Sequence, residues 1–367
     1  VIKKEVNSDY CGSYFRLNKR TFQYIDVKDI ENMYLSAKDN INYKFDFDNY
    51  KNTKNVDEIV EVEETNIKMD TEESGLLQVK FETEQSNFNK IPGKPFAYWA
   101  SKEILRVFSE GTELGKIIPI RQRLATADNN RFLRLWYEVN VIDEKLSSSS
   151  ADEAKSSNLK WFPYNKGGAF RKWYGNNDYV VNWENDGFEI KNFKDENGKL
   201  RSRPQNLEYY FRKSISWSLI SSGSIAFRFK PYGHIFDIAG MSCFPDEDMF
   251  LYILGLNNTK IINNIMKFIA PTLNYQVGDI SKIPIINNTD YKDSIEKLVE
   301  SNIEISKEDW DSFETSWDFK KHSLLEFVDS MPGLHDSNVE VPPTHLKIVK
   351  NNYGEECFIA DELPMNA

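Results

Sequence analysis

The spacing of hydrophobic positions changes along the chain, and this change predicts two kinds of secondary structure. Residues 131–139, 214–220 and 224–229 alternate between apolar and polar side chains. Such alternation predicts strands, because successive side chains of a strand point to opposite faces. Residues 245–256 and 259–269 instead repeat their apolar positions at helical spacing. We therefore expect strands in the middle of the chain and helices after them.

Two further strand-like runs, Asp178–Trp183 and Phe188–Phe193, flank the segment Glu184-Asn185-Asp186-Gly187. An Asp-Gly pair between such runs predicts a β-hairpin, because these residues accept the positive φ of a tight turn. Together with strands at Arg131–Val139 and Ser214–Phe229, this hairpin predicts an α+β fold. It would contain a mixed, mostly antiparallel, curved sheet with flanking helices and a helical C-terminal part.

Four further helices are expected outside these runs. Phe96–Phe108 places its apolar residues on one helical face. Ser202 is a suitable cap for a short helix at Pro204–Lys213. Asp290–Asn302 is expected to be helical, and Ser306 to begin another helix.

Prolines and glycines predict the division of the chain into domains. Gly12–Leu17 and Thr21–Ile25 predict two strands, a third is expected at Leu76–Phe81, and the charge around it is dense and negative. Prolines on both sides of Gly93 then place a boundary near Ile91. We expect a tail and acidic linker at residues 1–90, a middle domain at 91–289, and a helical segment with an irregular end at 290–367.

Composition narrows the class of protein. The 367 residues are 40% hydrophobic and 14% aromatic, which is enough for real cores. No apolar run approaches the roughly 20 residues of a membrane helix, and Val1–Glu5 has no signal-peptide pattern, so we expect a cytoplasmic protein. Cys11, Cys243 and Cys357 lie too far apart for a zinc motif and suit a reducing compartment. Because the chain does not begin with Met, we expect a fragment of a longer protein.

Residues 160–232 are basic in an acidic chain. They hold thirteen Lys and Arg against seven Asp and Glu, whereas the whole chain has a net charge of −11. The same stretch contains seventeen aromatic residues. Basic side chains among flat rings suit a surface that neutralises phosphate and packs on sugars or bases. The alternative is an aromatic-rich, half-buried sheet whose charges are merely solvated.

Few motifs indicate catalysis by the chain itself. The four histidines show no metal-ligand spacing, and no P-loop, Gly-x-Ser-x-Gly or Gly-x-Gly-x-x-G motif is present. One pattern is nuclease-like: Asp178, then Glu189 and Lys191 on the second strand of the expected hairpin. Two carboxylates there could hold Mg²⁺ while the lysine steadies the attacking water. Such spacing also arises easily in a chain that is 28% charged, and a solvated hairpin face is the alternative.

Motifs for methyl transfer are also missing. Amino-methyltransferases of nucleic acid need an Asn/Asp/Ser-Pro-Pro-aromatic loop that accepts a flipped base. The chain has one Pro-Pro pair, Pro342-Pro343, between Val341 and Thr344. It also lacks a glycine-rich turn suited to S-adenosylmethionine. We expect no catalytic residue, no cofactor and no metal in this chain.

Six segments form a recognisable set: 91–99 (IPGKPFAYW), 125–139 (ATADNNRFLRLWYEV), 160–168 (KWFPYNKGG), 179–187 (YVVNWENDG), 275–280 (YQVGDI) and 309–319 (DWDSFETSWDF). In this order they resemble the large adenine-specific DNA methyltransferases of the PglX type, from BREX phage-defence systems, and related restriction-modification enzymes. The resemblance implies that Ile91–Ile286 is a target-recognition domain and that residues 1–90 are the tail of a catalytic domain. It also implies that the parent enzyme binds S-adenosylmethionine upstream of this chain.

The chain departs from the family at two places. Arg123 and Ala127 stand where the family tends to have glycines, which puts in doubt a role there that needs positive φ or close approach to phosphate. Met331–Ala367 is short and differs from the further helices that the family would usually have.

We therefore expect sequence-specific recognition of double-stranded DNA for an adenine-N6 methyltransferase in restriction-modification or phage defence. Arg and Asn can read guanine and adenine edges, whereas Lys more often meets phosphate. Two basic loops supply the candidate DNA-binding residues: Arg121, Arg123, Asn129, Asn130 and Arg131 in the first, and Lys166, Arg171, Lys172, Lys199, Arg201 and Arg203 in the second.

Two other classes of function remain open at this point. One is a metal-dependent nuclease that uses Asp178, Glu189 and Lys191, and the other is a protein-interaction module. The expected partners are duplex DNA, the upstream methyltransferase domain and other defence-system subunits. Salt-dependent duplex binding separates DNA recognition from protein interaction, and Mg²⁺-dependent cleavage separates the nuclease from both.

Overall fold

The computed structural model describes residues 10–17, 25–54, 76–122, 124–221, 223–272, 274–287, 290–322, 346–350 and 356–360. The chain forms two compact units, Val1–Gly111 and Thr112–Ala367. Helices are mixed with mostly antiparallel strand pairs, which confirms the predicted α+β class. The domain limits expected near residues 90 and 289 stay predictions.

Short strands and two helices surround the core of the first unit. They are β1 (Cys11–Phe15), α1 (Val27–Asp39), β2 (Lys44–Asp46), α2 (Phe47–Lys54), β3 (Leu76–Gln78) and β4 (Lys80–Glu84). β1 pairs antiparallel with β4, and β2 with β3. Met33 and Ala37, one helical turn apart on α1, are buried with Phe47 and Leu77. The strand predicted at Thr21–Ile25 lies almost entirely outside the described residues.

The first unit ends with η2 (Gln85–Asn89) and α5 (Lys102–Glu110). The helix was expected to begin at Phe96, but it begins after Ser101, whose hydroxyl accepts a hydrogen bond from the Ile104 amide at 3.3 Å. Serine is a preferred N-cap, so the helix starts there. The residues before it make aromatic contacts instead: the Tyr98 ring stacks on Tyr14 with centroids 5.0 Å apart.

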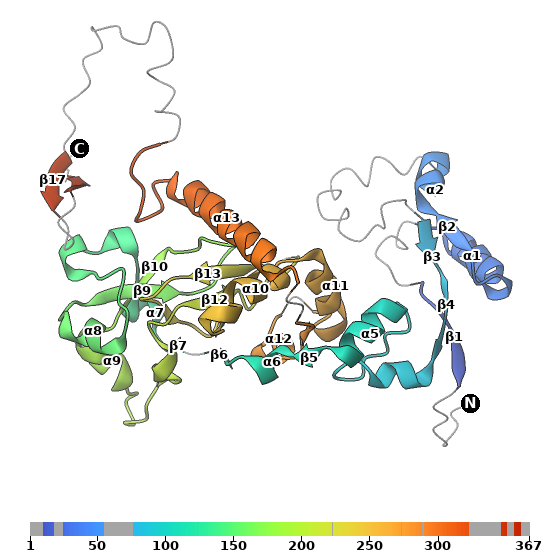
Figure 1. Ribbon diagram of the computed structural model, residues 1–367, viewed down its shortest axis with the longest axis horizontal. Helices are drawn as coiled ribbons and strands as arrows, with labels where there is room; N and C mark the ends of the chain where they lie inside the picture. Colours follow the sequence, from blue (N-terminus) through green and yellow to red (C-terminus); the bar gives the residue numbers. More distant parts are fainter. Residues whose placement is uncertain are drawn as a thin grey trace, which may run out of the picture. The chain divides into compact units, whose positions relative to one another are not determined.

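Two four-stranded sheets organise the described part of the second unit (Figure 1). Their strand orders are β14-β9-β10-β8 and β13-β12-β15-β6, and only β14 and β9 run parallel within them. The strands are β6 (Ile120–Arg121), β8 (Leu133–Leu135), β9 (Trp161–Asn165), β10 (Tyr179–Asn182), β12 (Ser214–Trp217), β13 (Phe227–Lys230), β14 (Ile235–Phe236) and β15 (Ser242–Cys243). The strands expected in a single sheet are thus divided between two.

The hairpin predicted at Asp178–Phe193 is wrong. β10 is a central strand, with β9 on one side and β8 on the other, so neither edge is open to a hairpin partner. The Asp-Gly segment does turn with positive φ, at 51° for Asn185, 59° for Asp186 and 69° for Gly187. The turn lies within α9 (Glu184–Lys191), and the helical residues after it bury Ile190 in the core.

The predicted strand at Arg131–Val139 and the predicted helix at Pro204–Lys213 also need correction. Arg131–Val139 is a strand only at β8, because α7 (Asn129–Phe132) precedes it and η3 (Trp136–Glu138) follows it. Pro204–Lys213 contains a single 3₁₀ turn, η5 (Leu207–Tyr209), after the short strand β11 (Arg203–Pro204).

The helices after the second sheet follow the predictions more closely. α10 (Glu247–Asn257) begins after Asp246, and α11 (Lys260–Ile269) begins after Thr259, whose hydroxyl accepts from the Ile262 amide at 3.2 Å. α13 (Lys292–Asp311) continues through Ser306, so the helix expected to start there does not exist as a separate element.

The remaining elements are short. They are β5 (Thr112–Glu113), α6 (Leu114–Ile117), β7 (Leu124–Ala125), η4 (Val141–Asp143), α8 (Ala151–Ser156), α12 (Val277–Ile280), β16 (Pro284–Ile285), β17 (Leu346–Lys350) and β18 (Glu356–Ala360). No helix in the described ranges has the length and apolar character that crossing a membrane requires.

Candidate nucleic-acid interface

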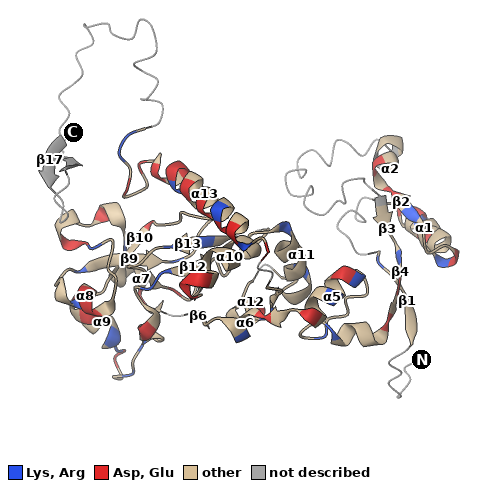
Figure 2. Ribbon diagram, viewed as in Figure 1, with Lys and Arg blue, Asp and Glu red and all other residues tan. Residues whose placement is uncertain are grey.

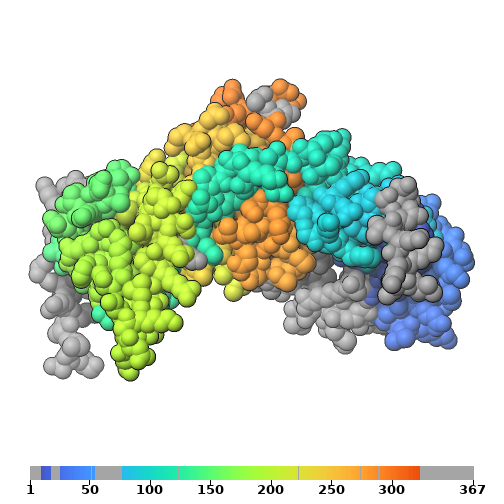
Figure 3. Space-filling view, turned by 90° about the horizontal axis from the view of Figure 1, so that it is seen from below, coloured from blue at the N-terminus to red at the C-terminus, as the bar shows by residue number. Residues whose placement is uncertain are grey.

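Residues 193–203, which we call the finger, project from the second unit between α9 and β11 (Figure 1, Figure 3). The finger is a short loop closed by one antiparallel bridge: the Arg201 amide donates to the Phe193 carbonyl at 2.9 Å, and Lys194 faces Leu200 across the bridge. At its tip the Asp195 carboxylate accepts from the Lys199 amide at 2.9 Å. Hydrogen bonds within the finger therefore close its turn while it stands in solvent.

The base of the finger is fixed beside the first predicted basic loop. Its last residue, Arg203, belongs to β11, which pairs antiparallel with β7. The Ser202 hydroxyl donates to the Ile190 carbonyl of α9, and the Asn206 amide donates to the Gln122 carbonyl at 3.2 Å. Segments about 80 residues apart in sequence are thus held side by side.

The first loop presents its polar side chains through the short helix α7. The Asp128 carboxylate accepts from the Arg131 amide at 3.1 Å, and the Thr126 hydroxyl donates to Asn129 at 2.6 Å. Ala127 adopts a φ of 62°, the left-handed region that favours glycine and that the family's glycine would suit. Asn129, Asn130 and Arg131 are exposed on this loop.

An aromatic ring joins the two loops. The guanidinium carbons of Arg131 and Arg201 lie 5.0 and 5.2 Å from the centroid of the Phe193 ring. Arg131 also donates to the Glu189 carboxylate, with Nε at 2.8 Å and Nη2 at 2.5 Å. Both groups are about half exposed, so this ion pair is open to competition from an anionic ligand.

Three of the predicted cations are not paired with a described acidic side chain. Lys199, Arg201 and Arg203 are exposed and form no ion pair among the described residues. Figure 2 shows blue Lys and Arg segments on the finger below α9. Arg121 lies nearby but is half-buried, with its guanidinium 4.9 Å from the Tyr209 ring and a 2.9 Å hydrogen bond to the Ile120 carbonyl. Arg123 lies outside the described residues.

The other three predicted cations belong to residues 166–177, which we call the anchored loop. Lys166 sits 4.4 Å from the Tyr179 ring centroid. Arg171 donates to the Asp309 carboxylate at 2.7 Å and stacks 5.0 Å from Trp310 of α13. Lys172 donates to the Asn258 carbonyl at 2.7 Å, and burial lowers its pKa. The structure therefore does not bring Arg171 and Lys172 to the finger; it holds them against protein groups.

Two further cations support the anchored loop from β13, and the sequence interpretation did not single them out. The fully buried Lys230 donates to the Gly175 and Asn176 carbonyls, each at 2.9 Å, and to the Asn177 side-chain oxygen at 2.5 Å. Arg228 donates to the Ser218 hydroxyl at 2.9 Å. Burial lowers the pKa of Lys230 well below its ordinary value and that of Arg228 to about 10. No local pattern distinguishes these two residues from solvated strand charges.

The nuclease-like arrangement expected on the hairpin does not form. Glu189 and Lys191 lie on α9, where Glu189 accepts from Arg131 and Lys191 donates to Asp186 at 2.7 Å. Asp178 precedes β10, and burial raises its pKa. Within the described ranges, no group of three His, Cys, Asp or Glu side chains is placed to hold a metal ion.

Comparison with known proteins agrees with the resemblance. No profile of a known protein family matches the chain. Adenine-specific methyltransferase PglX of Lacticaseibacillus casei (strain Zhang) is 39% identical over 252 residues, and adenine-specific methyltransferase BrxX of Escherichia coli O9:H4 (strain HS) is 38% identical over 251 residues. The matched regions are 68% and 66% of this chain and 21% and 19% of the two relatives, so the chain spans about a fifth of their length. The chain is therefore homologous to one region of the adenine-specific methyltransferases PglX and BrxX.

Proposed function

We propose that the chain is the region of an adenine-specific DNA methyltransferase that recognises double-stranded DNA, in restriction-modification or phage defence of the BREX type. The observation that carries the proposal is the joining of two basic loops at Phe193, with Arg131 and Arg201 on its ring. The names of the two relatives support the link to methyl transfer on adenine.

The finger is the element that we assign to a groove of the duplex. In the major groove of B-DNA, arginine reads guanine and asparagine reads adenine by paired hydrogen bonds. Arg201 and Arg203 are suited to base edges and Lys199 to phosphate. Asn129, Asn130 and Arg131 would contact the same duplex from the neighbouring loop, with Arg131 exchanging Glu189 for DNA.

Methyl transfer itself is assigned to parts of the parent protein outside this chain. S-adenosylmethionine would bind there and supply the methyl group, while this region selects the site. Isothermal calorimetry checks this division: the isolated chain should show no binding of S-adenosylmethionine, and micromolar affinity would contradict it.

Titration of a duplex across a salt series tests the recognition function. A variant with Lys199→Gln, Arg201→Gln and Arg203→Gln loses three exposed cations from the finger. Its matched control loses three exposed cations from α11 and α13, through Lys260→Gln, Lys267→Gln and Lys297→Gln. Both variants have the same net charge, so only the position of the lost charge differs.

The finger variant should bind more weakly, and its slope of log affinity against log salt should fall by roughly 1, since Lys199 is the phosphate contact among the three and each such contact contributes about 0.9. The control should keep most of the slope. Equal slopes in the two variants would show that the finger is not the DNA contact. A wild-type chain with no salt-dependent duplex binding would instead favour the protein-interaction module.

A further inference from the structure

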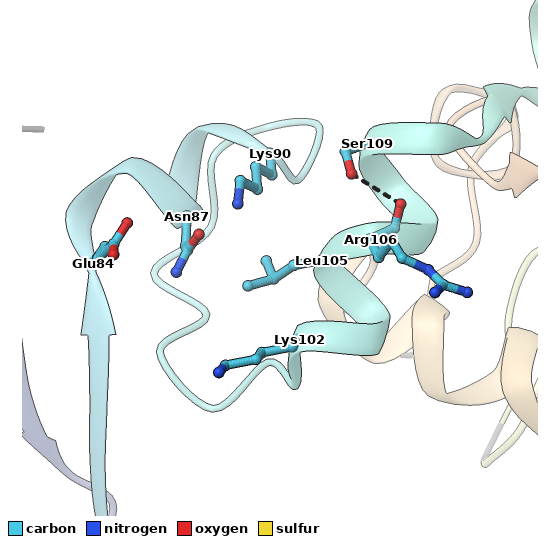
Figure 4. Close-up of a pocket in the computed structure, with 7 residues that line it drawn as sticks. All are labelled: Glu84, Asn87, Lys90, Lys102, Leu105, Arg106 and Ser109. Carbon is cyan, nitrogen blue, oxygen red and sulfur yellow. Dashed lines mark hydrogen bonds between the residues drawn. The ribbon is translucent and has the colours of Figure 1, made fainter. Parts of the chain in front are cut away.

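A cavity in the first unit lies between the 3₁₀ helix η2 and the helix α5 (Figure 4). Its volume is about 380 Å³, and its walls come from one contiguous part of the chain. The lining residues are Glu84, Asn87, Lys90, Lys102, Leu105, Arg106 and Ser109. None of the candidate DNA-binding residues belongs to it.

The sequence builds one wall of this cavity from a single helical face. Lys102, Leu105 and Ser109 follow each other at intervals of three and four residues, so they project from the same side of α5. Ser101 caps the helix and fixes where this face begins. Leu105 is buried and forms the apolar floor. Asn87 and Lys90 approach from η2 and the residue that follows it.

Two of the charged residues that line the cavity, Lys90 and Lys102, lack protein partners among the described residues. Figure 4 shows Lys90 and Lys102 directing their amino groups into the cavity from opposite walls. Neither lysine forms an ion pair or side-chain hydrogen bond with a described residue. Two like charges that face one space repel each other, and a bound anion relieves that repulsion.

The other charged lining residues are Glu84, with one negative charge, and Arg106, with one positive charge, so the lining as a whole is positive. The Arg106 guanidinium points away from the cavity in Figure 4 and lies 3.6 Å from the Glu110 carboxylate. The carboxylate of Glu84 accepts from the Ser86 hydroxyl at 3.2 Å. The Asn87 amide donates to the Thr83 hydroxyl at 3.0 Å, which leaves its second N–H as a donor beside the lysines.

We propose that this cavity binds a phosphoryl group, held by the amino groups of Lys90 and Lys102 and by the side-chain amide of Asn87. Ammonium groups suit phosphate as point charges, and the amide adds a directional donor. The phosphoryl group comes either from a small phosphorylated molecule or from a nucleic-acid backbone. The proposal is independent of the DNA-recognition function assigned to the second unit.

Calorimetric titration of the full chain with pyrophosphate and orthophosphate tests the site. The test variant carries Lys90→Gln and Lys102→Gln, and the control carries Lys28→Gln, an exposed lysine of α1 in the same unit. Pyrophosphate should bind to the wild type and to the control. Each lost lysine should weaken binding by roughly tenfold, as expected for a hydrogen bond to a charged group.

Duplex titration of the same three proteins distinguishes the source of the phosphoryl group. If the lysine variant binds duplex more weakly than the control, the ligand is a backbone phosphate; if only pyrophosphate binding is lost, it is a small molecule. Loss of pyrophosphate binding in the finger variant, with the lysine variant unaffected, would overturn the site. Absence of any effect of the two lysines on pyrophosphate and on duplex would also overturn it. Thermal melting of each variant confirms that it is folded.

Discussion

The anchored loop and the finger are both basic, yet they use their cations in opposite ways. The anchored loop and β13 direct theirs toward protein oxygens, as in the contacts of Lys172 and Lys230. The finger leaves Lys199, Arg201 and Arg203 in solvent. Similar composition therefore supports packing in one region and is available to a ligand in the other.

The number of backbone carbonyls that can accept hydrogen bonds nearby explains why one set of cations is buried and the other exposed. In the anchored loop, Trp173, Gly175 and Asn176 have φ values of 70°, 113° and 55°, and the backbone they form leaves the Gly175 and Asn176 carbonyls facing Lys230. In the finger, the Asp195 amide donates to the Lys199 carbonyl and the Gly198 amide to the Asp195 carbonyl, each at 2.9 Å. No described finger carbonyl accepts from the side chain of Lys199, Arg201 or Arg203. A buried cation needs such acceptors, and an exposed one remains free for a ligand.

Replacement of the buried lysine should have the largest effect on stability. Lys230→Met leaves the Gly175 and Asn176 carbonyls without their donor, which should lower the free energy of unfolding by about 3 kcal/mol. Urea denaturation measures the change. Lys199→Met on the finger is the control and should stay within about 0.5 kcal/mol of the wild type. Equal losses would remove the distinction between the two regions.

Removal of an exposed arginine should act on binding instead. Arg201→Ala should weaken binding to the recognised duplex by about 1–3 kcal/mol and leave the urea midpoint unchanged. Fluorescence anisotropy with a labelled duplex gives the affinity. The comparison would fail if Arg201→Ala destabilised the protein as strongly as Lys230→Met.

Acidification should lower the stability of the region around the buried His234 before it affects the finger. Burial, with the nearby charge of Lys230, lowers the pKa of His234 to about 3, below the ~6.5 of an unfolded chain. Protons therefore bind the unfolded chain first, and the stability that His234 contributes above its unfolded pKa is lost as pH falls toward the folded pKa. One pH unit below the unfolded value, the loss is about 1.4 kcal/mol.

Comparison of urea denaturation for wild type and His234→Gln at several pH values isolates this effect. The wild type should lose more stability on acidification than the variant does. Parallel pH profiles would show that His234 is not held neutral in the folded protein. The arginines of the finger stay charged throughout this range, so they contribute no matching change.

The smallest effect is expected at the contact between the anchored loop and α13. Arg171 and Asp309 are partly exposed, at 32% and 59% of their side chains, so solvent screens their ion pair. A double-mutant cycle with Arg171→Ala and Asp309→Ala should give a coupling free energy below about 1 kcal/mol. A much larger coupling would mean that α13 anchors the loop as firmly as Lys230 does.

The sequence predicted those elements whose signals are local. Asp246 and Thr259 mark the starts of α10 and α11, and the alternation in β12 and β13 marks two neighbouring strands. The Asp-Gly turn was also recognised as a turn. Its consequence was misjudged because the edges of β10 are occupied by β8 and β9, which lie far away in the sequence.

The sequence predicts which basic residues belong to the candidate interface, but it does not predict how they are arranged in space. Its basic loops stand out in an acidic chain, and their residues could be named from the sequence. The contact of Arg131 and Arg201 on Phe193 depends on the pairing of β7 with β11, which no local pattern encodes. The inward direction of Lys172 likewise depends on the Asn258 carbonyl, 86 residues away.

The self-contained backbone of the finger has a consequence for how such proteins diversify. Its turn is closed by Asp195 and Gly198, and its attachment rests on Ser202 and β11, so the residues between can change without disturbing the sheets. Loops of this kind tolerate insertion and substitution far better than cores do. Under the proposed function, exchange of the finger between related proteins would give a lineage a new target site while it retains one scaffold.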